Sequence, residues 1–389
     1  MARLFHFSDT HLGHQQYPRT GPDGLNVRET DLYLAFRAVV DRAVEERPDA
    51  VVHAGDLFDG VRPSNRALAQ ALDGFLALDR AGIPTILIAG NHEHPKMRET
   101  GSPFRLFEHL PNVHPVYRGR RETVQVETPE GPLRIHAVPQ CASNEALAAE
   151  VGGIEAGQDG HDVLVLHGAV HHLDAFRNAE FNELTLDTRW FDDRFAYVAL
   201  GHYHGVHEIA ENAWYCGAPE RVSMAESGER KGFLDVSLGD RAEVRFRALP
   251  GRPYADLPRI DGTGLDTEGV ETAVRDAVAG VPEGAVVRLV LEHLDPTLRG
   301  VLDVRRLRAL GDRALHFDLR LDWQDTEHRV RGAAELHGLA EEFEAYAASH
   351  PVEGLDRARL LRRARAVLSD SPASDPENPE APRVREALA

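Results

Sequence analysis

Seven side chains with the chemistry of metal ligands stand in five short motifs between residues 8 and 205. The motifs are SDTHLG, AGDLFD, AGNHEH, LHGAVHH and LGHYHG, and the candidate ligands in them are Asp9, His11, Asp56, Asn91, His167, His202 and His204. Two carboxylates, one amide oxygen and four imidazoles are too many for one ion, so the set suits two. Mixed nitrogen and oxygen ligation favours manganese, iron or zinc over magnesium or calcium.

The spacing of these ligands predicts a dinuclear site. Asp9 and His11 are two residues apart, and at the exit of a strand that spacing points both side chains to one side. The same holds for His202 and His204, while Asp56 could bridge the two ions. Two metal ions about 3.5–4 Å apart can hold a phosphoester, activate a bridging water and stabilise the leaving oxygen. Each motif alone arises often by chance, so the prediction depends on the ordered set.

The elements that would position these ligands are short apolar runs, each ending at a motif. Ligands of α/β sheets bind at the carboxyl ends of strands, so five such ends could meet in one crevice. Helical spacing of apolar residues at 29–46 and 64–82, between the first strands, predicts a layered α/β sheet. Strands are predicted at 3–8, 50–56, 85–90, 132–139, 162–168 and 196–202, with shorter strands following to residue 249.

The remainder of the chain divides into smaller parts. A seam near Pro250-Gly251 precedes a stretch that mixes helices and strands, which is the size of a small α/β domain. Two amphipathic helices follow, with Pro351 between them, and the end is rich in proline, serine and acidic residues, which predicts disorder. The predicted parts are 1–250, 251–330, 331–369 and 370–389.

Composition limits the classes of function. The 389 residues carry a formal net charge of -19, which disfavours a general nucleic-acid coat but leaves room for a local basic patch. No apolar run approaches the ~20 residues of a membrane span. Cys141 and Cys216 form no disulfide framework or zinc spacing, and the N-terminus shows no signal peptide. We therefore expect a cytoplasmic protein without membrane contact.

The motifs resemble those of the calcineurin-like metallophosphoesterase superfamily. Within it, SDTHLGHQQY, GDLFDGVRPS, GNHE, LHG, GHYH and YCGAPERVSMAE followed by RKGF resemble the SbcD family of DNA double-strand-break repair nucleases, whose archaeal and eukaryotic relatives are the Mre-eleven nucleases. The resemblance is specific over 1–250 and weaker beyond. It implies an α-β-β-α sandwich followed by a small α/β capping domain and a helix pair.

The resemblance also implies an activity and its partners. The expected activity is manganese-dependent 3′-to-5′ exonuclease and endonuclease action on DNA ends, with two Mn²⁺ per subunit or other divalent transition metals. Residues 251–330 would cap DNA, and 331–369 would bind an SbcC/Rad-fifty-type coiled-coil ATPase. The family is typically homodimeric, and a cytoplasmic, nucleoid-associated location follows from the substrate.

Carried over by motif, the resemblance divides the ligands between two ions and leaves His92 to the substrate. His92 would stabilise the transition state or protonate the leaving oxygen. One ion would take Asp9, His11, Asp56 and His204, and the other Asp56, Asn91, His167 and His202.

Some neighbouring residues are expected to play supporting roles. Relatives often have a histidine after GDLF, where this chain has Asp59; an acid there is expected to orient His92 or a neighbour. His14 is a candidate substrate contact. Glu93 and His94 have no expected role beyond supporting the ligands, and Glu93 could be a solvated loop acid.

Three further side chains are candidate contacts of DNA phosphates: Arg62, Asn65 and Arg221. Alternatively, Arg62 is an ordinary charged residue on the surface that does not contact DNA.

Two other functions stay open from the sequence. A small-molecule phosphodiesterase would use the same metal motifs, but it would need neither the second domain nor the helix pair. A non-catalytic scaffold that bridges an ATPase and DNA is the other alternative. It would be attractive if a metal ligand were missing, but all seven are present, so it ranks last.

Overall fold

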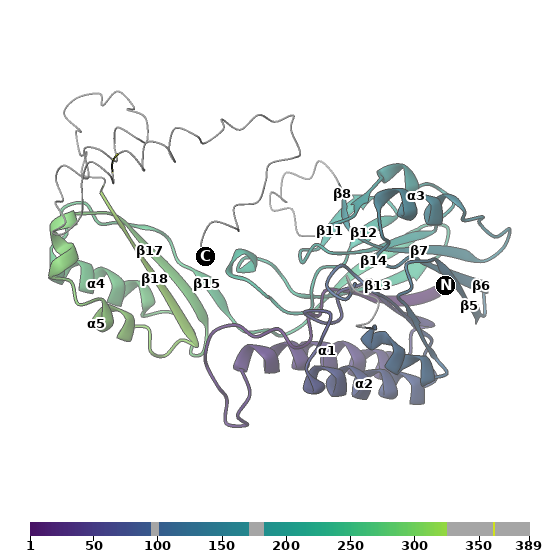
Figure 1. Ribbon diagram of the computed structural model, residues 1–389, viewed down its shortest axis with the longest axis horizontal. Coiled ribbons are helices and arrows are strands. Elements are labelled where there is room, and N and C mark those ends of the chain that lie inside the picture. Colours follow the sequence, from purple (N-terminus) through teal and green to yellow (C-terminus); the bar gives the residue numbers. More distant parts are fainter. Residues whose placement is uncertain (95–100, 171–182, 325–360, 362–389) are drawn as a thin grey trace. The chain divides into compact units, whose positions relative to one another are not determined.

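The computed structural model describes residues 1–94, 101–170, 183–324 and Leu361. Two six-stranded sheets form its largest part (Figure 1). The first sheet contains, in spatial order, β14 (Ala242–Ala248), β13 (Gly232–Leu238), β1 (Ala2–Phe7), β2 (Ala50–His53), β3 (Thr85–Ile88) and β4 (Val113–Val116). The second contains β11 (His207–Ala210), β12 (Ala213–Tyr215), β10 (Tyr197–Gly201), β7 (His161–His167), β6 (Gly131–Ala137) and β5 (Glu122–Thr128).

The centres of both sheets are parallel. In the first, β1, β2, β3 and β4 run parallel, and β13 and β14 continue antiparallel. In the second, β12, β10, β7 and β6 run parallel. Buried side chains of both sheets form one apolar cluster, with Leu4 and Val52 from the first and Ile135 and Val163 from the second. The sheets therefore pack face to face.

Helices cover the outer faces of this sandwich. α1 (Val27–Glu46) and α2 (Asn65–Arg80) lie side by side (Figure 1). They share a cluster with alternate residues of β1, such as Phe5 and Phe7. α3 (Asn144–Gly152) packs with side chains of the second sheet. The four layers confirm the predicted α-β-β-α sandwich.

Both predicted helices are present, although α1 begins two residues before the predicted start at 29 and α2 ends two residues before the predicted end at 82. The Asn26 side chain accepts hydrogen bonds from the first turn of α1, and Ser64 caps α2 through the main-chain N–H of Ala67. Such caps satisfy main-chain donors that the first turn leaves without partners. Short elements complete this part of the chain: η2 (Pro103–His109), β8 (Ala169–Val170), β9 (Thr185–Leu186), η3 (Thr188–Trp190) and η4 (Met224–Glu226).

A smaller parallel sheet follows, with its own apolar clusters. Its strands are β15 (Tyr254–Asp256), β16 (Ile260–Asp261), β17 (Val286–Leu294) and β18 (His316–Trp323), and its helices are α4 (Thr267–Val278), η5 (Pro296–Gly300) and α5 (Val304–Ala309). Met1–Gln324 form one compact unit, so the seam at 250/251 stays a prediction. The segments 331–369 and 370–389 lie outside the described residues, except Leu361.

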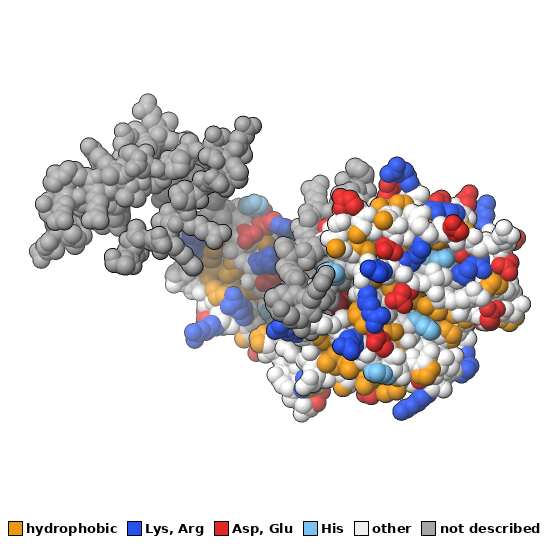
Figure 2. Space-filling view, turned by 45° about the vertical axis from the view of Figure 1, so that its right-hand side comes forward, with side chains coloured by type: hydrophobic (Ala, Val, Ile, Leu, Met, Phe, Trp, Pro, Cys, Tyr) orange, Lys and Arg blue, Asp and Glu red, His pale blue; other side chains and the backbone are white. Residues whose placement is uncertain are grey.

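Two surface properties bear on function. Among the described residues, no helix is long and apolar enough to cross a membrane. On the face shown in Figure 2, the coloured basic and acidic side chains are interspersed rather than gathered by sign. Binding to a polyanion at this face would therefore depend on local contacts rather than on a broad positive field.

Candidate metal centre

The seven predicted ligands come together at one edge of the sandwich, from strand ends of both sheets. From the first sheet come the loops after β1, β2 and β3. From the second come the last residue of β7 and the loop after β10, where Gly201 pairs with His167. The sequence predicted a crevice in a layered sheet, and the structure divides the ligands between two facing sheets.

The loops after β1 and β2 turn through left-handed backbone conformations. The φ angles of Asp9, His11 and Asp56 are 53°, 42° and 54°, which non-glycine residues seldom adopt. Main-chain hydrogen bonds hold the loops together, from Asp9 N to Gly55 O (3.0 Å) and from His11 N to Asp56 O (3.1 Å). Asp9 and His11 thus reach one site through turns. The predicted reason, alternation at a strand exit, was wrong.

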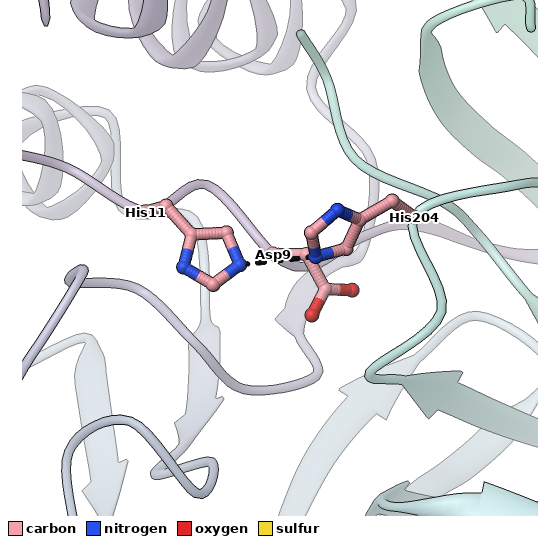
Figure 3. Close-up of side chains that lie close together, drawn as sticks. All are labelled: Asp9, His11 and His204. Atoms are coloured by element: carbon pink, nitrogen blue, oxygen red, sulfur yellow. Dashed lines mark hydrogen bonds between the residues drawn. The ribbon is translucent and has the colours of Figure 1, made fainter. Parts of the chain in front are cut away.

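The first half of the centre contains Asp9, His11 and His204, with one ligand atom from each within 4.8 Å of the others. Figure 3 shows the two imidazoles facing each other, with Nε2 of His11 3.1 Å from Nε2 of His204. His204 Nδ1 lies 3.1 Å from Glu226 Oε1. Because a carboxylate only accepts, Nδ1–H donates to it, and Nε2 offers a lone pair whenever that nitrogen carries no proton.

The second half contains Asp56, His167 and His202, again within 4.8 Å. His167 Nδ1 donates to Ala54 O (2.8 Å), so its Nε2 faces the centre. That nitrogen lies 2.9 Å from Asn91 Oδ1 and 3.3 Å from Asp56 Oδ2. His202 Nε2 lies 2.8 Å from Glu183 Oε1, which leaves Nδ1 of that ring to the centre.

The electrostatics of the second half are those of a cation site. Burial opposes charge on His167, but Asp56 outweighs it and raises the pKa of His167 to about 9. Burial likewise opposes charge on Asp56, while His167 holds the pKa of Asp56 well below its usual range. A proton on Nε2 therefore occupies the place, between a carboxylate and an amide oxygen, that a metal ion would take. The donor set fits divalent transition metals.

Two glycines give these ligands their room. A Cβ on Gly90 would overlap the Asp56 carboxylate, and a Cβ on Gly55 would overlap the His167 ring. Gly55 also has a φ of +98°, which L side chains avoid. The glycines before Asp56 and Asn91 are therefore required for close packing of the two loops.

His92 lies beside both halves. Its main-chain N donates to Asp56 Oδ1 (3.1 Å), and its Nδ1 lies 3.0 Å from the carbonyl oxygen of Asp59, which fixes Nδ1–H as the donor. His92 Nε2 is 3.9 Å from Asp56 Oδ2, within reach of a ligand grouping with His11. Its side chain is 29% exposed against 4% for His11, and its substrate-facing role stays a prediction.

Asp59 links several of these groups. Its carboxylate lies 3.0 Å from His14 Nδ1 and 3.8 Å from His11 Nδ1. Its carbonyl oxygen, rather than its carboxylate, orients His92. The roles of Asp59 and His14 in catalysis remain predictions. His94 lines a cavity of about 530 Å³, which Glu183 also lines.

Of the two roles that the sequence left open for Glu93, the structure supports the one beside the ligands and excludes a solvated loop acid. Glu93 is buried, and its two oxygens accept from Phe58 N (2.6 Å) and Gly90 N (2.9 Å). It thereby joins the loop after β2 to the loop after β3. Burial, together with the charge of Asp56, raises the pKa of Glu93 to about 8. The signal in the sequence was an acid placed three residues after the glycine that ends a buried strand.

The candidate DNA contacts differ in their surroundings. Arg62 and Asn65 are exposed, in the loop after Asp56 and at the start of α2. Arg221 instead donates to main-chain carbonyl oxygens of Glu226 (3.2 Å), Arg252 (3.4 Å) and Glu229. Arg221 therefore holds its own loop, a role that the sequence did not reveal, and all three DNA contacts stay predictions.

Comparisons with known proteins identify the family of the chain. Residues 2–227 match the calcineurin-like phosphoesterase family. The chain is similar to the DNA double-strand break repair protein Mre11 of Haloferax volcanii, with 31% identity covering 100% of this chain and 88% of the relative. The same protein of Halobacterium salinarum is 30% identical, covering 95% of each chain. A dimetal phosphatase from Danio rerio is 14% identical, covering 63% of this chain and 96% of its own, with a TM-score of 0.38 that carries no argument.

Proposed function

The chain belongs to the calcineurin-like phosphoesterase family and, within it, to the Mre11 nucleases, and from this premise we propose that it cleaves DNA ends during double-strand-break repair. It is a metal-dependent phosphodiester hydrolase with a dinuclear site for divalent metals. The observation that carries the proposal is the convergence of all seven predicted ligands from two sheets. We propose two Mn²⁺ per subunit as the resident ions.

The ligand assignment is part of the proposal. Asp56 would bridge, since its carboxylate belongs to ligand groupings with His11 and with His167. When bound, two divalent cations polarise the phosphodiester and activate the attacking water. The first ion would take Asp9, His11, Asp56 and His204, and the second Asp56, Asn91, His167 and His202.

The chain's own residues would handle substrate and proton. His92 directs its Nδ1 proton to the Asp59 carbonyl oxygen, and Nε2 is the ring nitrogen that would face the scissile phosphate. A protonated Nε2 would donate to the leaving oxygen or to a non-bridging oxygen as negative charge develops. Asn91 contributes a neutral oxygen, which limits the negative charge that a phosphate would meet. Arg62 and Asn65 would contact the DNA backbone.

Partners and domain roles extend the proposal. We propose that 251–330 cap the DNA, that 331–369 bind an SbcC/Rad-fifty-type coiled-coil ATPase, and that the protein acts as a homodimer in the cytoplasm at the nucleoid. Full-length similarity to a double-strand break repair protein supports these roles. Deleting 333–369 should leave manganese-dependent hydrolysis intact and abolish ATPase capture. If the ATPase is still captured after the deletion, residues 333–369 have another function.

The decisive test compares substrates. Purified protein with Mn²⁺ is incubated separately with blunt DNA, hairpin DNA, bis-p-nitrophenyl phosphate and cyclic nucleotides. We expect cleavage of both DNA substrates, inhibited by chelation. Turnover of cyclic nucleotides without DNA cleavage would establish a small-molecule phosphodiesterase instead. Binding of DNA with no hydrolysis of any substrate would establish a scaffold.

A further inference from the structure

Lys231 is a buried lysine in a chain that has almost none. Only Lys96 and Lys231 among its 44 basic residues are lysines, and Lys231 has 1% of its side chain exposed. It directly precedes β13, whose pairing with β14 fixes the main chain there. Burial of a charge is costly unless the charge is paired and hydrogen-bonded. The partners of Lys231 should therefore explain its presence.

Those partners converge on His204. Lys231 Nζ lies 2.6 Å from Glu226 Oε2, 2.7 Å from Glu229 Oε2 and 2.8 Å from the carbonyl oxygen of His204. The other oxygen of the Glu226 carboxylate, Oε1, accepts from Nδ1 of His204 at 3.1 Å. One ion pair thus holds the main chain of His204 and its ring at the same time.

The arrangement suits lysine better than arginine. The ammonium group has three donor hydrogens, and here acceptors from three residues surround one nitrogen. A planar guanidinium spreads its donors in a fixed fork and cannot place one atom at that point. Arginine serves almost everywhere else in this chain, so this environment gives a physical reason for lysine here.

The Glu226 carboxylate is fully engaged as an acceptor. Oε1 also accepts from Ser223 Oγ (3.1 Å), and Oε2 accepts from the main-chain N of Val222 (3.3 Å). Such a carboxylate cannot turn away from His204 without losing several hydrogen bonds. Outer partners of this kind fix the tautomer and orientation of a metal-binding histidine.

We propose that Lys231 and Glu226 are positioning residues, which together hold His204 with Nδ1 protonated and Nε2 aimed at the ion of the first half. This inference rests on the proposed metal centre but not on DNA as the substrate. Loss of Lys231 frees the His204 carbonyl and leaves the buried Glu226 carboxylate and the partly exposed Glu229 carboxylate without their cation. The ring then loses its fixed direction, and the first ion loses an oriented ligand.

The test uses the full chain and two readouts. Manganese binding is measured by titration calorimetry, and the His204 tautomer is measured in metal-free protein from long-range ¹H–¹⁵N correlations of labelled histidine. Lys231→Met should weaken one of the two manganese sites about 10- to 100-fold and abolish the single Nδ1–H tautomer. Lys231→Arg should restore binding only in part. Arg230→Met changes the exposed neighbour and should match the wild type.

The remaining outcomes also decide. If Lys231→Met does not fold, the double variant Lys231→Met with Glu226→Gln removes both charges and should show the same weakened site. Unchanged affinity at both sites, with His204 still Nδ1-protonated, would overturn the inference. A wild-type protein that binds no manganese would contradict the proposed function. The tautomer measurement would still test whether Lys231 and Glu226 hold His204.

Discussion

His202 and His204 come from the same motif, two residues apart, yet each presents a different ring nitrogen to the centre. Nε2 of His202 bonds Glu183, so Nδ1 is left for an ion. Nδ1 of His204 bonds Glu226, so Nε2 is left. The motif supplies two identical side chains, and carboxylates from outside it select the nitrogen that each one uses. Ligand geometry therefore depends on residues that no ligand motif contains.

The two halves also differ in charge. Burial and the neighbouring His204 lower the pKa of His11 to about 4, so the first half holds a neutral ring there. In the second half Asp56 overcomes burial and raises the pKa of His167 to about 9. Lys231 neutralises Glu226, whereas no ion pair of Glu183 with lysine or arginine occurs among the described residues. The Lys231–Glu226 ion pair, which lies outside the ligand set, supports the first half. The second half is supported by the ion pair between two of its own ligands, Asp56 and His167.

Asp56→Asn should have the largest effect, because the Asp56 carboxylate belongs to ligand groupings with residues of both halves. We expect loss of both ions and a fall in hydrolysis of about 1,000-fold or more, since a metal ion contributes several kcal/mol to the transition state. Metal content of the dialysed variant checks this. Retention of one ion at wild-type affinity would show that the halves are independent and that Asp56 does not bridge.

His92→Gln should separate catalysis from binding. Hydrolysis should fall about 100- to 1,000-fold, as on loss of one group that stabilises developing charge. Both ions should remain, because the link to Asp56 is made by the main-chain N of His92. Comparing turnover with metal content measures the two effects separately. A loss of half the manganese would identify His92 as a ligand.

Glu183→Gln and Glu226→Gln form a matched pair that probes one half each. Each should weaken a single ion about 10- to 100-fold and leave the other near its wild-type affinity. Each variant is then combined with Asn91→Ala, which removes a ligand of the second half. Glu226→Gln should weaken the first ion in this background as well, which identifies the site that each substitution affects. If both variants weakened the same ion, the assignment of His202 and His204 to different halves would be wrong.

Metal-free protein should lose stability as the pH rises from about 6.5 to about 9. His167 has a folded pKa of about 9 against an ordinary 6.5, so its contribution is complete below 6.5 and gone above 9. Glu93 has a folded pKa of about 8 against an ordinary 4.5, so its contribution to the free energy of unfolding also falls as the pH rises. Thermal unfolding across this range measures the slope, which Glu93→Gln should flatten. Saturating Mn²⁺ should reverse the trend, because ligands bind metal deprotonated.

The sequence predicted the layers and the ligands because both follow from regular signals. Apolar runs marked the strands, Ser64 marked a helix start, and polar motifs followed strand ends. It could not predict the left-handed turns that aim Asp9 and His11, since either residue fits other conformations. Nor could it predict Glu183, Glu226 and Lys231 as partners of the histidines, because folding alone brings them together.

The central claim is that two half-sites from two sheets share one bridging carboxylate and so hold a coupled pair of ions. Electron paramagnetic resonance of the protein loaded with two equivalents of Mn²⁺ tests it directly. The account predicts the spectrum of two exchange-coupled ions, lost in Asp56→Asn. A spectrum composed only of isolated, uncoupled Mn²⁺ signals at full loading would contradict it.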